Sequence, residues 1–425
     1  MSYSSQTSAT LLILTIVSSF AACSDATAPD EEFTGWTQVA VGNAHACALT
    51  NNGEAYCWGD SSDGQAGVIG GAGLLTLPTA VDTDVRFVQI EAGGRLTCGR
   101  TAEDRLFCWG DNQWGQLGNG GIADSPRPWE VEGQYSWTDV SVGHGHACAV
   151  ESGGTMLCWG GDPWDMLLGY RASQTCLASP DFDGRMPCAG VPTAVDAALS
   201  FTSVKVSAGA TCGGTSSGAV CWGSNRYGEL GRTTTGTCAT TDPRYGTRDC
   251  SRDPGSPIGQ SFTTILPGST HACGLAAGGA PYCWGALVLD MGQVGTGVDG
   301  GAAEPTPIVG LSSLDFLATS PASHIRTFTC GIQSGGTGHC WGANTEGQLG
   351  APTTEDCGSA FPIPCSRTPV AIETSAGLQS IALGSEFACA LTLDGEILCW
   401  GKNAEGQLGD GSLTTRQTPA AILSP

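Results

Sequence analysis

Cysteine is the residue type with the clearest chemistry in this chain, and most of the cysteines occur in pairs of fixed spacing. Seven times, a cysteine is followed nine or ten positions later by the cysteine of a Cys-Trp-Gly motif. The pairs are Cys47 and Cys57, Cys98 and Cys108, Cys148 and Cys158, Cys212 and Cys221, Cys273 and Cys283, Cys330 and Cys340, and Cys389 and Cys399. Paired thiols either form disulfides or bind zinc. Seven equivalent pairs in a chain with features of export favour disulfides, so we predict no metal site.

Six further cysteines form three local pairs, and one cysteine is then left over. The local pairs are Cys176 and Cys188, Cys238 and Cys250, and Cys357 and Cys365. An even set of cysteines indicates an oxidising compartment. The remaining residue, Cys23, follows Phe20-Ala21-Ala22, and this segment resembles the lipobox of bacterial lipoproteins, in which the cysteine is lipidated.

The region before Cys23 has the pattern of an export signal. Residues 11–17 form an apolar run that is too short to span a bilayer. We therefore predict a lipoprotein-type signal peptide over residues 1–22, a lipid-anchored acidic tether over 23–32, and a location in the cell envelope, facing the periplasm or the cell surface. A plain cleaved secretory signal is the alternative, because Phe20 stands where leucine is usual and no lysine or arginine precedes Arg86.

The elements that position each cysteine pair are expected to be strands. In the first copy, residues 36–41 and 45–50 have apolar residues at alternate positions, and Asn51-Asn52-Gly53 is typical of a hairpin turn. A hairpin folded at Asn52 places Cys47 opposite Cys57, at a separation near the one that a disulfide spans. A glycine-rich turn and a proline-led strand, such as residues 78–81, follow each Cys-Trp-Gly. Each unit thus holds roughly four strands, the content of a propeller blade.

The motif W-G-x-N-x-x-G-Q-L-G after H-x-C-A-L-T-x-x-G-x-x-C-W-G resembles the regulator of chromosome condensation repeat. The resemblance covers residues 33–425 and implies an all-β fold, a seven-bladed β-propeller of about 50–60-residue repeats. The chain ends in a strand, residues 418–423, and begins at Phe33 with a hairpin that lacks this strand. We expect the N- and C-terminal strands to pair in one blade and close the ring.

The three longest insertions fall at the same place in the repeat, between the Leu-Gly turn and the proline-led strand. They comprise residues 170–191, 232–257 and 351–367, and each contains one of the local cysteine pairs. All three should therefore emerge on one face, where repeat proteins often bind their partners. Drift in loop length, with disulfides that protect against proteolysis, is the alternative.

The second insertion is rich in arginine and tyrosine, which are typical anchors of interfaces. The candidate partner-binding residues are Arg226, Tyr227, Arg232, Arg244, Tyr245, Arg248 and Arg252. They would suit an acidic protein or a glycan that carries carboxylates. Alternatively, they only balance the acidic residues nearby.

Catalysis has little support in the sequence, and we predict no catalytic residue and no cofactor. His45, His146 and His271 each stand two positions before a repeat cysteine, where other copies have Leu96, Ala210, Phe328 and Phe387, so we interpret them as part of the repeat. The G-x-S-x-G match at residues 214–218 lies in a predicted hairpin turn rather than a nucleophile elbow. With a net charge of −23 and only two lysines, the chain is also expected to avoid nucleic acids.

The sequence as a whole predicts a monomeric, non-catalytic binding module for an unknown protein or glycan, which meets the membrane only through its lipid anchor. Two alternatives stay open: an envelope enzyme acting on polysaccharide with its site in the central channel, and a rigid structural spacer. The family resemblance also implies guanine-nucleotide exchange as a precedent. An exported acidic chain departs from it in compartment and charge, so we consider exchange unlikely.

Overall fold

The computed structural model describes residues 1–2, 33, 35–70, 73–162, 166–177, 185–195, 198–239, 247–257, 259–321, 326–358 and 362–425. Residues 34–425 form one compact unit. The predicted signal peptide, Cys23 and the tether lie outside the described residues, so they remain predictions. Among the residues that are described, no helix is long and apolar enough to cross a membrane.

The compact unit consists of seven antiparallel sheets, which we number as blades 1 to 7 in chain order. The first strands of the blades are β1 (Trp36–Val41), β5 (Gln89–Gly93), β9 (Trp137–Val142), β14 (Phe201–Val206), β19 (Phe262–Pro267), β23 (Phe316–Thr319) and β28 (Leu378–Leu383). The second strands are β2 (His45–Thr50), β6 (Leu96–Arg100), β10 (His146–Glu151), β15 (Ala210–Thr215), β20 (His271–Ala276), β24 (Phe328–Ile332) and β29 (Phe387–Thr392). A 3₁₀ turn, η1 (Ala277–Gly279), follows β20.

The third and fourth strands complete each blade. The third strands, which carry the Cys-Trp-Gly motifs, are β3 (Ala55–Asp60), β7 (Leu106–Gly110), β11 (Met156–Gly161), β16 (Gly218–Ser224), β21 (Pro281–Gly285), β25 (Gly338–Ala343) and β30 (Ile397–Gly401). The outer strands are β4 (Leu74–Ala80), β8 (Ser125–Glu130), β13 (Arg185–Ala194), β18 (Thr247–Gly255), β22 (Ala302–Pro307), β27 (Ile363–Ala371) and β31 (Arg416–Ala421). Blades 3, 4 and 6 add a fifth strand each, β12 (Gln174–Leu177), β17 (Gly236–Ala239) and β26 (Glu355–Cys357).

The seven-bladed propeller confirms the predicted fold, but the prediction of how the ring closes was wrong. Each blade is built from consecutive strands, so β1 belongs to blade 1 and β31 is the outer strand of blade 7. The predicted closure required the C-terminal proline-led strand to complete the blade of the N-terminal hairpin, whereas each such strand pairs back onto the strand that precedes it, as Tyr56 opposite Ala80 shows. Proline cannot donate a backbone hydrogen bond, and a strand that contains it is therefore best placed at the outer edge.

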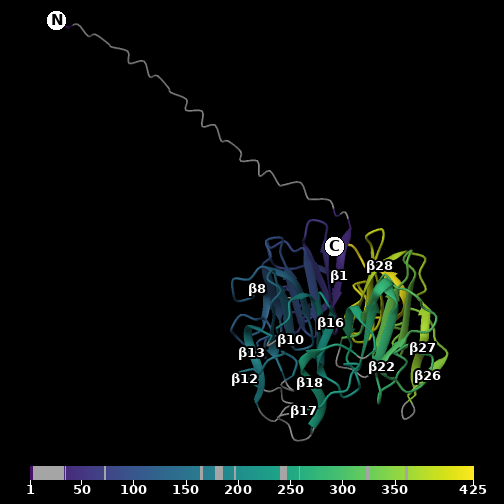
Figure 1. Cartoon of the computed structure of the whole chain (residues 1–425). Coiled ribbons are helices and arrows are strands. Elements are labelled where there is room, and N and C mark those ends of the chain that lie inside the picture. The colour runs from purple at the N-terminus through teal and green to yellow at the C-terminus, as the bar shows by residue number, and fades with distance from the viewer. Residues whose placement is uncertain are drawn as a thin grey trace. The chain divides into compact units, whose positions relative to one another are not determined.

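The ring closes instead by packing of blade 1 against blade 7, where β1 lies beside β28 and β29 (Figure 1). Three hydrogen bonds between described residues cross this junction, and in one of them the backbone N–H of Gly411 donates to the carbonyl of Thr76 (2.9 Å). The backbone N–H of Trp36 donates to the carbonyl of Gly395 (2.9 Å), and the indole Nε1–H of Trp58 donates to the carbonyl of Gln407 (2.9 Å).

The tryptophan of the repeat links successive blades. All seven Cys-Trp-Gly tryptophans are fully buried. Six of them donate their indole N–H to a carbonyl in the turn of the preceding blade, as Trp159 does to Gln116 (2.9 Å). The exception is Trp109, whose indole nitrogen is buried without a partner. The turn that supplies the carbonyl is fixed by its asparagine, since Asn112 accepts from the N–H of Leu117 (2.9 Å).

The glycine of Cys-Trp-Gly is required by a bulge in the third strand. Gly59 has φ +96°, and a Cβ built there would lie 2.4 Å from the carbonyl oxygen of Ala44. The pairing of β3 with β4 shifts register at this point, between Cys57 and Gly59. A side chain at this position would therefore be strained and would also clash.

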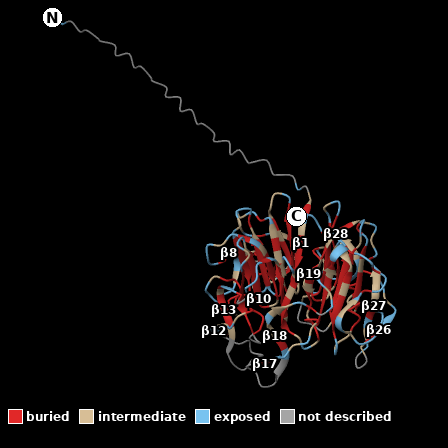
Figure 2. Cartoon of the chain, in the orientation of Figure 1, coloured by how far each residue is buried: buried red, intermediate tan, exposed pale blue. Residues whose placement is uncertain are grey.

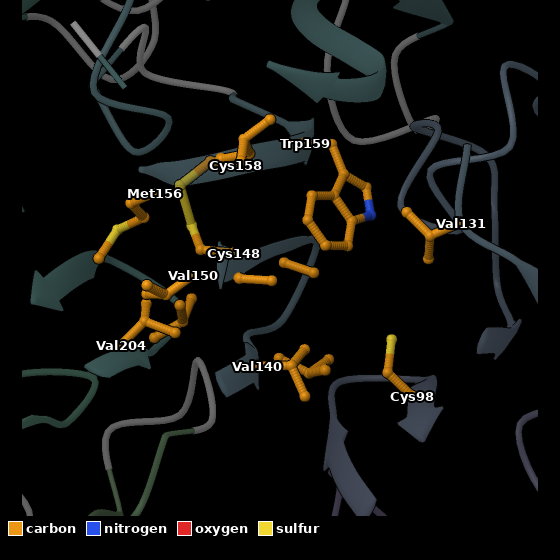
Figure 3. Close-up of a cluster of buried hydrophobic side chains, with 14 of the residues drawn as sticks. Cys98, Val131, Val140, Cys148, Val150, Met156, Cys158, Trp159 and Val204 are labelled. Atoms are coloured by element: carbon orange, nitrogen blue, oxygen red, sulfur yellow. A yellow bond between two sulfur atoms is a disulfide. The ribbon is translucent and has the colours of Figure 1, made fainter. Parts of the chain in front are cut away.

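The core lies between the blades rather than in one central cluster. Figure 2 shows buried strands throughout the ring and exposed residues mainly in its loops. In the cluster of Figure 3, Trp159 and the Cys148–Cys158 disulfide of blade 3 pack between Cys98 of blade 2 and Val204 of blade 4. Each blade therefore buries its apolar faces only against its neighbours, as repeat proteins do.

Loops between the first and second strands close one end of the central channel. The backbone N–H of Asn43 in blade 1 donates to the carbonyl of Gly94 in blade 2 (2.9 Å). The N–H of Ala208 in blade 4 donates to the carbonyl of Pro321 in blade 6 (3.0 Å), so this contact passes over blade 5. In the same set of loops, the hydroxyl of Ser320 donates to the carbonyl of Gly384 in blade 7 (3.1 Å). We call this set of loops the channel floor.

Candidate functional site

The three inserted loops form β-hairpins that project from one face of the ring, as predicted. In each, the outer strand extends beyond the blade and pairs with the added strand, β12 with β13, β17 with β18, and β26 with β27. All three follow a third strand, so they lie on the same face as the channel floor. Figure 1 places β12, β17 and β26 at one end of the ring. We call this side the hairpin face.

The hairpins share one geometry. In each, a disulfide joins two cysteines that are diagonal neighbours across the strand pair, for example Cys176, which lies opposite Met186, and Cys188, which lies opposite Gln174. The Cα–Cα distances are 5.8, 5.9 and 5.8 Å in blades 3, 4 and 6. The other four blades have only short connections at this point, residues 68–74, 119–124, 296–301 and 410–415.

The seven repeat disulfides are of a different kind. They join directly opposed residues of the second and third strands, with Cα–Cα distances of 4.0–4.1 Å. Cys47, for instance, lies opposite Cys57 in the β2–β3 pair. The repeat disulfides lie within the blades, whereas the hairpin disulfides stiffen segments that extend beyond them. The structure thus joins all of the cysteine pairs proposed from the sequence.

The arginine-rich segment of blade 4 divides into exposed and structural residues. Arg226 is exposed, and its guanidinium lies 5.2 Å from the centre of the Tyr227 ring. Arg232 is half-buried and donates to the carbonyls of Cys221 (3.3 Å) and Asp253 (2.9 Å). Burial lowers the pKa of Arg232, and Asp253 opposes this effect. Arg232 therefore supports the base of the hairpin, whereas Arg226 and Tyr227 form an accessible pair among the described residues of this segment.

The remaining predicted binding residues are less informative. Arg244 and Tyr245 lie outside the described residues. Arg248 is on β18 opposite Cys238, and Arg252 is a half-buried residue of the same strand. The predicted cluster therefore lies on one hairpin and its base, but the structure does not show its members converging on a single point.

A polar recess on the hairpin face was not predicted from the sequence. It has a volume of about 870 Å³ and lies over the junction of blades 7 and 1, which carry no hairpin. Its charged lining comprises Asp60, Arg95, Arg326, Glu386, Lys402 and Glu405. The recess is formed by loops from distant parts of the chain, so no local motif marks it. The one available signal was the rarity of lysine, because Lys402 is one of only two in the chain.

Glu386 organises the charges of the recess. Its carboxylate accepts from Arg326 (2.9 Å) and from the ammonium of Lys402 (3.1 Å). Burial raises the pKa of Glu386, but the hydrogen bonds and charges of these two cations outweigh that effect and leave the pKa lowered. Glu386 thus holds two of the three cations of the recess, Arg326 and Lys402, in fixed positions on a strongly acidic protein, which suits the recess to polar groups of a partner.

The three histidines are structural, as the sequence suggested. Nε2 of His45 lies 2.9 Å from the hydroxyl oxygen of Thr97 in the next blade, and His146–Thr211 (3.1 Å) and His271–Thr329 (2.8 Å) repeat the contact. The Thr97 hydroxyl itself donates to the carbonyl of Gln65 (2.8 Å), so its oxygen accepts and Nε2 of His45 carries the proton.

Burial lowers the pKa of all three histidines. The values are about 4 for His45, where Asp60 opposes the effect, and about 3 for His146 and for His271. Nδ1 of His45 and Nδ1 of His271 are buried without partners, so a second proton there would be an unpaired buried charge. In the described part of the chain, no three His, Cys, Asp or Glu residues are grouped so as to hold a metal ion.

Comparison with known proteins identifies the repeat. Models of the regulator of chromosome condensation (RCC1) repeat match residues 36–65, 87–116 and 379–407, and also 103–150, 336–391 and 394–425. The chain is 27% identical over 390 residues to the human E3 ubiquitin-protein ligase HERC2, covering 88% of this chain but only 7% of the ligase. It is 26% identical over 392 residues to the ultraviolet-B receptor UVR8 of Arabidopsis thaliana, covering 90% of this chain and 81% of the receptor.

Solved structures show the same fold. Prp20p from Saccharomyces cerevisiae, described with its binding to Gsp1p and histones, superposes with a TM-score of 0.69 at 17% identity, over 87% of this chain and 85% of Prp20p. Human WBSCR16 gives a TM-score of 0.67 at 17% identity, over 88% of this chain and 94% of WBSCR16. The six matched segments lie within seven consecutive blades, so this chain carries repeats of the regulator of chromosome condensation type in a propeller of the same fold.

Proposed function

We propose that this chain is an exported, lipid-anchored propeller that binds a protein partner through its hairpin face. The observation that carries the proposal is the occurrence of three hairpins of one geometry on one face. Each has the same added strand and the same diagonal disulfide, although their sequences differ. A disulfide that holds a projecting segment in place lowers the entropy lost when a partner binds.

The chemistry of the hairpin face suits a polar partner. The exposed Arg226–Tyr227 pair lies at the base of the blade 4 hairpin, and the recess offers Arg326 and Lys402 around Glu386. Arginine and tyrosine anchor many protein interfaces. A protein partner is favoured over a glycan because Prp20p, which has this fold, is described as binding the proteins Gsp1p and histones.

The proposed compartment rests on the disulfides and on Cys23. Ten disulfides in one chain persist only where thiols are not kept reduced. Cys23 is the cysteine that this set leaves over, and it stands where a lipobox would place the lipidated residue. Replacing Cys23 with alanine should release the protein from membranes into the soluble fraction. Unchanged membrane fractionation would contradict the lipid anchor.

Other functions receive less support. The hydrogen bonds that join loops of the channel floor argue against a polysaccharide-active enzyme that threads its substrate along the propeller axis. Guanine-nucleotide exchange is not part of the proposal, because an exported, strongly acidic chain departs from that precedent in compartment and charge. The spacer alternative predicts that the hairpins are dispensable, and the following experiment tests that directly.

The test is capture of partners from the organism's own envelope extract by the oxidised protein. In the test variant, the short connection of blade 2 (residues 119–124) replaces residues 170–188, 232–250 and 351–365, which removes all three hairpins. In the control variant, the same segment replaces residues 410–415 of blade 7, where no hairpin exists. A protein held by the parent and the control but lost from the test variant supports the proposal. Capture that is independent of the hairpins, or loss in both variants, contradicts it.

A further inference from the structure

The central channel contains a cavity of about 490 Å³ that is separate from the hairpin face. It is lined by residues of the first strands of all seven blades. At one equivalent position in these strands, blades 1, 6 and 7 carry Ala40, Ala318 and Ala382. The cavity exists because these three side chains are too small to fill the axis.

At the same level of the channel, the other blades present larger and mostly polar side chains. Blades 2, 3, 4 and 5 carry Glu91, Ser141, Lys205 and Leu266 at this position. An acid and a base therefore face the cavity from blades 2 and 4, with one blade between them. Lys205 is the only lysine in the chain besides Lys402.

A neighbouring carboxylate, Asp139, has a structural role instead. Its oxygens accept from the backbone N–H of Val204 in the next blade (2.9 Å), from that of Val140 (3.0 Å) and from the side-chain amide of Gln89 (3.1 Å). These bonds use most of its acceptor capacity and tie blades 2, 3 and 4 together.

The side chains of Glu91 and Lys205 have few hydrogen-bond partners in comparison. Glu91 receives one long hydrogen bond, from Gln89 (3.4 Å). Within the part of the chain that the structure describes, Lys205 forms no hydrogen bond or ion pair. Glu91 raises the pKa of Lys205 and outweighs its burial, so the ammonium stays protonated. Burial raises the pKa of Glu91, and the charge of Lys205 opposes the rise.

Besides the polar residues Gln38, Thr264, Thr319 and Ser380, the cavity wall has an apolar part. It includes Leu266 of blade 5, Phe316 and Leu317 of blade 6, and Ile381 of blade 7. The cavity is therefore amphipathic, with opposite charges on one side and an apolar surface on the other. The channel floor closes the end at the hairpin face, and the exposed Asp315 lies among the lining residues, so a ligand would enter from the opposite face.

We infer that this cavity binds a free α-amino acid with an apolar side chain. The ligand's carboxylate accepts hydrogen bonds from Lys205, its ammonium donates to Glu91, and its side chain lies against Leu266 and Phe316. A zwitterion fits better than a simple anion or amine, because Glu91 opposes the anion and Lys205 opposes the amine. A pocket with an apolar wall and a few placed polar groups is the usual form of a small-molecule site.

The test is isothermal titration calorimetry of the oxidised full chain with L-phenylalanine and L-leucine. N-acetyl-L-phenylalanine lacks the ammonium, and L-phenylalanine amide lacks the carboxylate, so both should bind about tenfold more weakly or worse. This ligand series needs no mutation. Equal binding of either blocked compound, binding of D-glucose in preference to the amino acids, or no binding at millimolar concentration would overturn the inference.

Variants test the same assignment from the side of the protein. Lys205→Met and Glu91→Gln should each weaken binding of L-phenylalanine by about tenfold. Lys402→Met, which removes the other lysine from the hairpin face, should leave it unchanged. The hairpin-deleted chain should also bind as the parent does, which separates this site from the proposed partner site. Unaltered affinity in both channel variants would contradict the assignment.

Discussion

Acidification from pH 7 to pH 5 should lower the free energy of unfolding, because three buried histidines stay neutral in the folded chain. Below about pH 6.5, a histidine in the unfolded chain binds a proton. In the folded chain, His45 resists protonation down to about pH 4, and His146 and His271 down to about pH 3. The unfolded state therefore binds more protons in this window, and the free energy of unfolding falls as the pH falls.

The magnitude follows from the number of groups. Each histidine contributes a slope of about 1.4 kcal/mol per pH unit once the pH is well below 6.5, or about 2 kcal/mol between pH 7 and pH 5. The three histidines together should lower the free energy of unfolding by about 6 kcal/mol between pH 7 and pH 5. Carboxylates with lowered pKa values, such as Glu386 and Asp410, lose their stabilising effect only at lower pH, near and below their ordinary values.

Urea unfolding of the disulfide-intact chain, monitored by tryptophan fluorescence across this pH range, measures the effect. The informative variant is the double substitution His271→Phe and Thr329→Ala, because blade 7 already places Phe387 in one cluster with Ala46 of blade 1. It should reduce the loss of stability between pH 7 and pH 5 by about 2 kcal/mol, or one third. Thr263→Ala, on the first strand of the same blade, serves as a control that keeps the histidine. An unchanged pH dependence in the double variant would refute the reasoning.

Three further outcomes are expected. Trp159→Phe removes an inter-blade hydrogen bond, whereas Trp109→Phe removes an indole nitrogen that has no partner. Trp159→Phe should therefore lower the free energy of unfolding, measured by chemical denaturation, by about 1–2 kcal/mol more than Trp109→Phe does. Equal losses in the two variants would contradict a stabilising role of the hydrogen bond. Arg232→Met should lower the free energy of unfolding by about 1–3 kcal/mol, because Arg232 donates to carbonyls at the base of the hairpin. Arg226→Ala should change the free energy of unfolding by less than about 0.5 kcal/mol and should weaken partner capture instead. A larger loss of stability in Arg226→Ala than in Arg232→Met would contradict the structural role of Arg232 and the binding role of Arg226. Glu386→Gln should change stability by no more than about 1 kcal/mol while altering partner capture, and unaltered capture would argue against the recess as part of the interface.

The repeat unit was predictable because its signals are local. A hairpin turn at Asn52 fixes the register that brings Cys47 opposite Cys57, and a glycine with positive φ ends the equivalent turn in every blade except blade 2, which has Asp104 there. The common face of the three hairpins followed from their equivalent place in the repeat. The pairing partner of the C-terminal proline-led strand could not be read from a local signal, because strands at both ends of the chain offered an edge to pair with. The prediction placed it beside the N-terminal hairpin, whereas it pairs with the strand that precedes it.

The candidate sites were less predictable because they combine residues that are far apart in the chain. Arg326 and Lys402 meet around Glu386 only when blades 6 and 7 pack side by side. Lys205 and Glu91 face one cavity because they occupy equivalent positions in blades 4 and 2. Conversely, Arg232 looked like a binding residue in the sequence, but its side chain points to carbonyls of its own blade.

The histidine–threonine contacts give the ring a chemical period of two blades. A histidine of blades 1, 3 and 5 forms a hydrogen bond with a threonine hydroxyl of blades 2, 4 and 6, respectively. An odd-numbered ring cannot complete such an alternation, and blade 7 resolves the conflict by placing Phe387 beside Ala46 of blade 1. Blades of this protein are therefore not interchangeable parts. Deleting one of the threonine blades 2, 4 or 6, or duplicating one of the histidine blades 1, 3 or 5, would bring a histidine against an alanine. Adding or removing an adjacent histidine–threonine pair of blades would preserve every kind of junction.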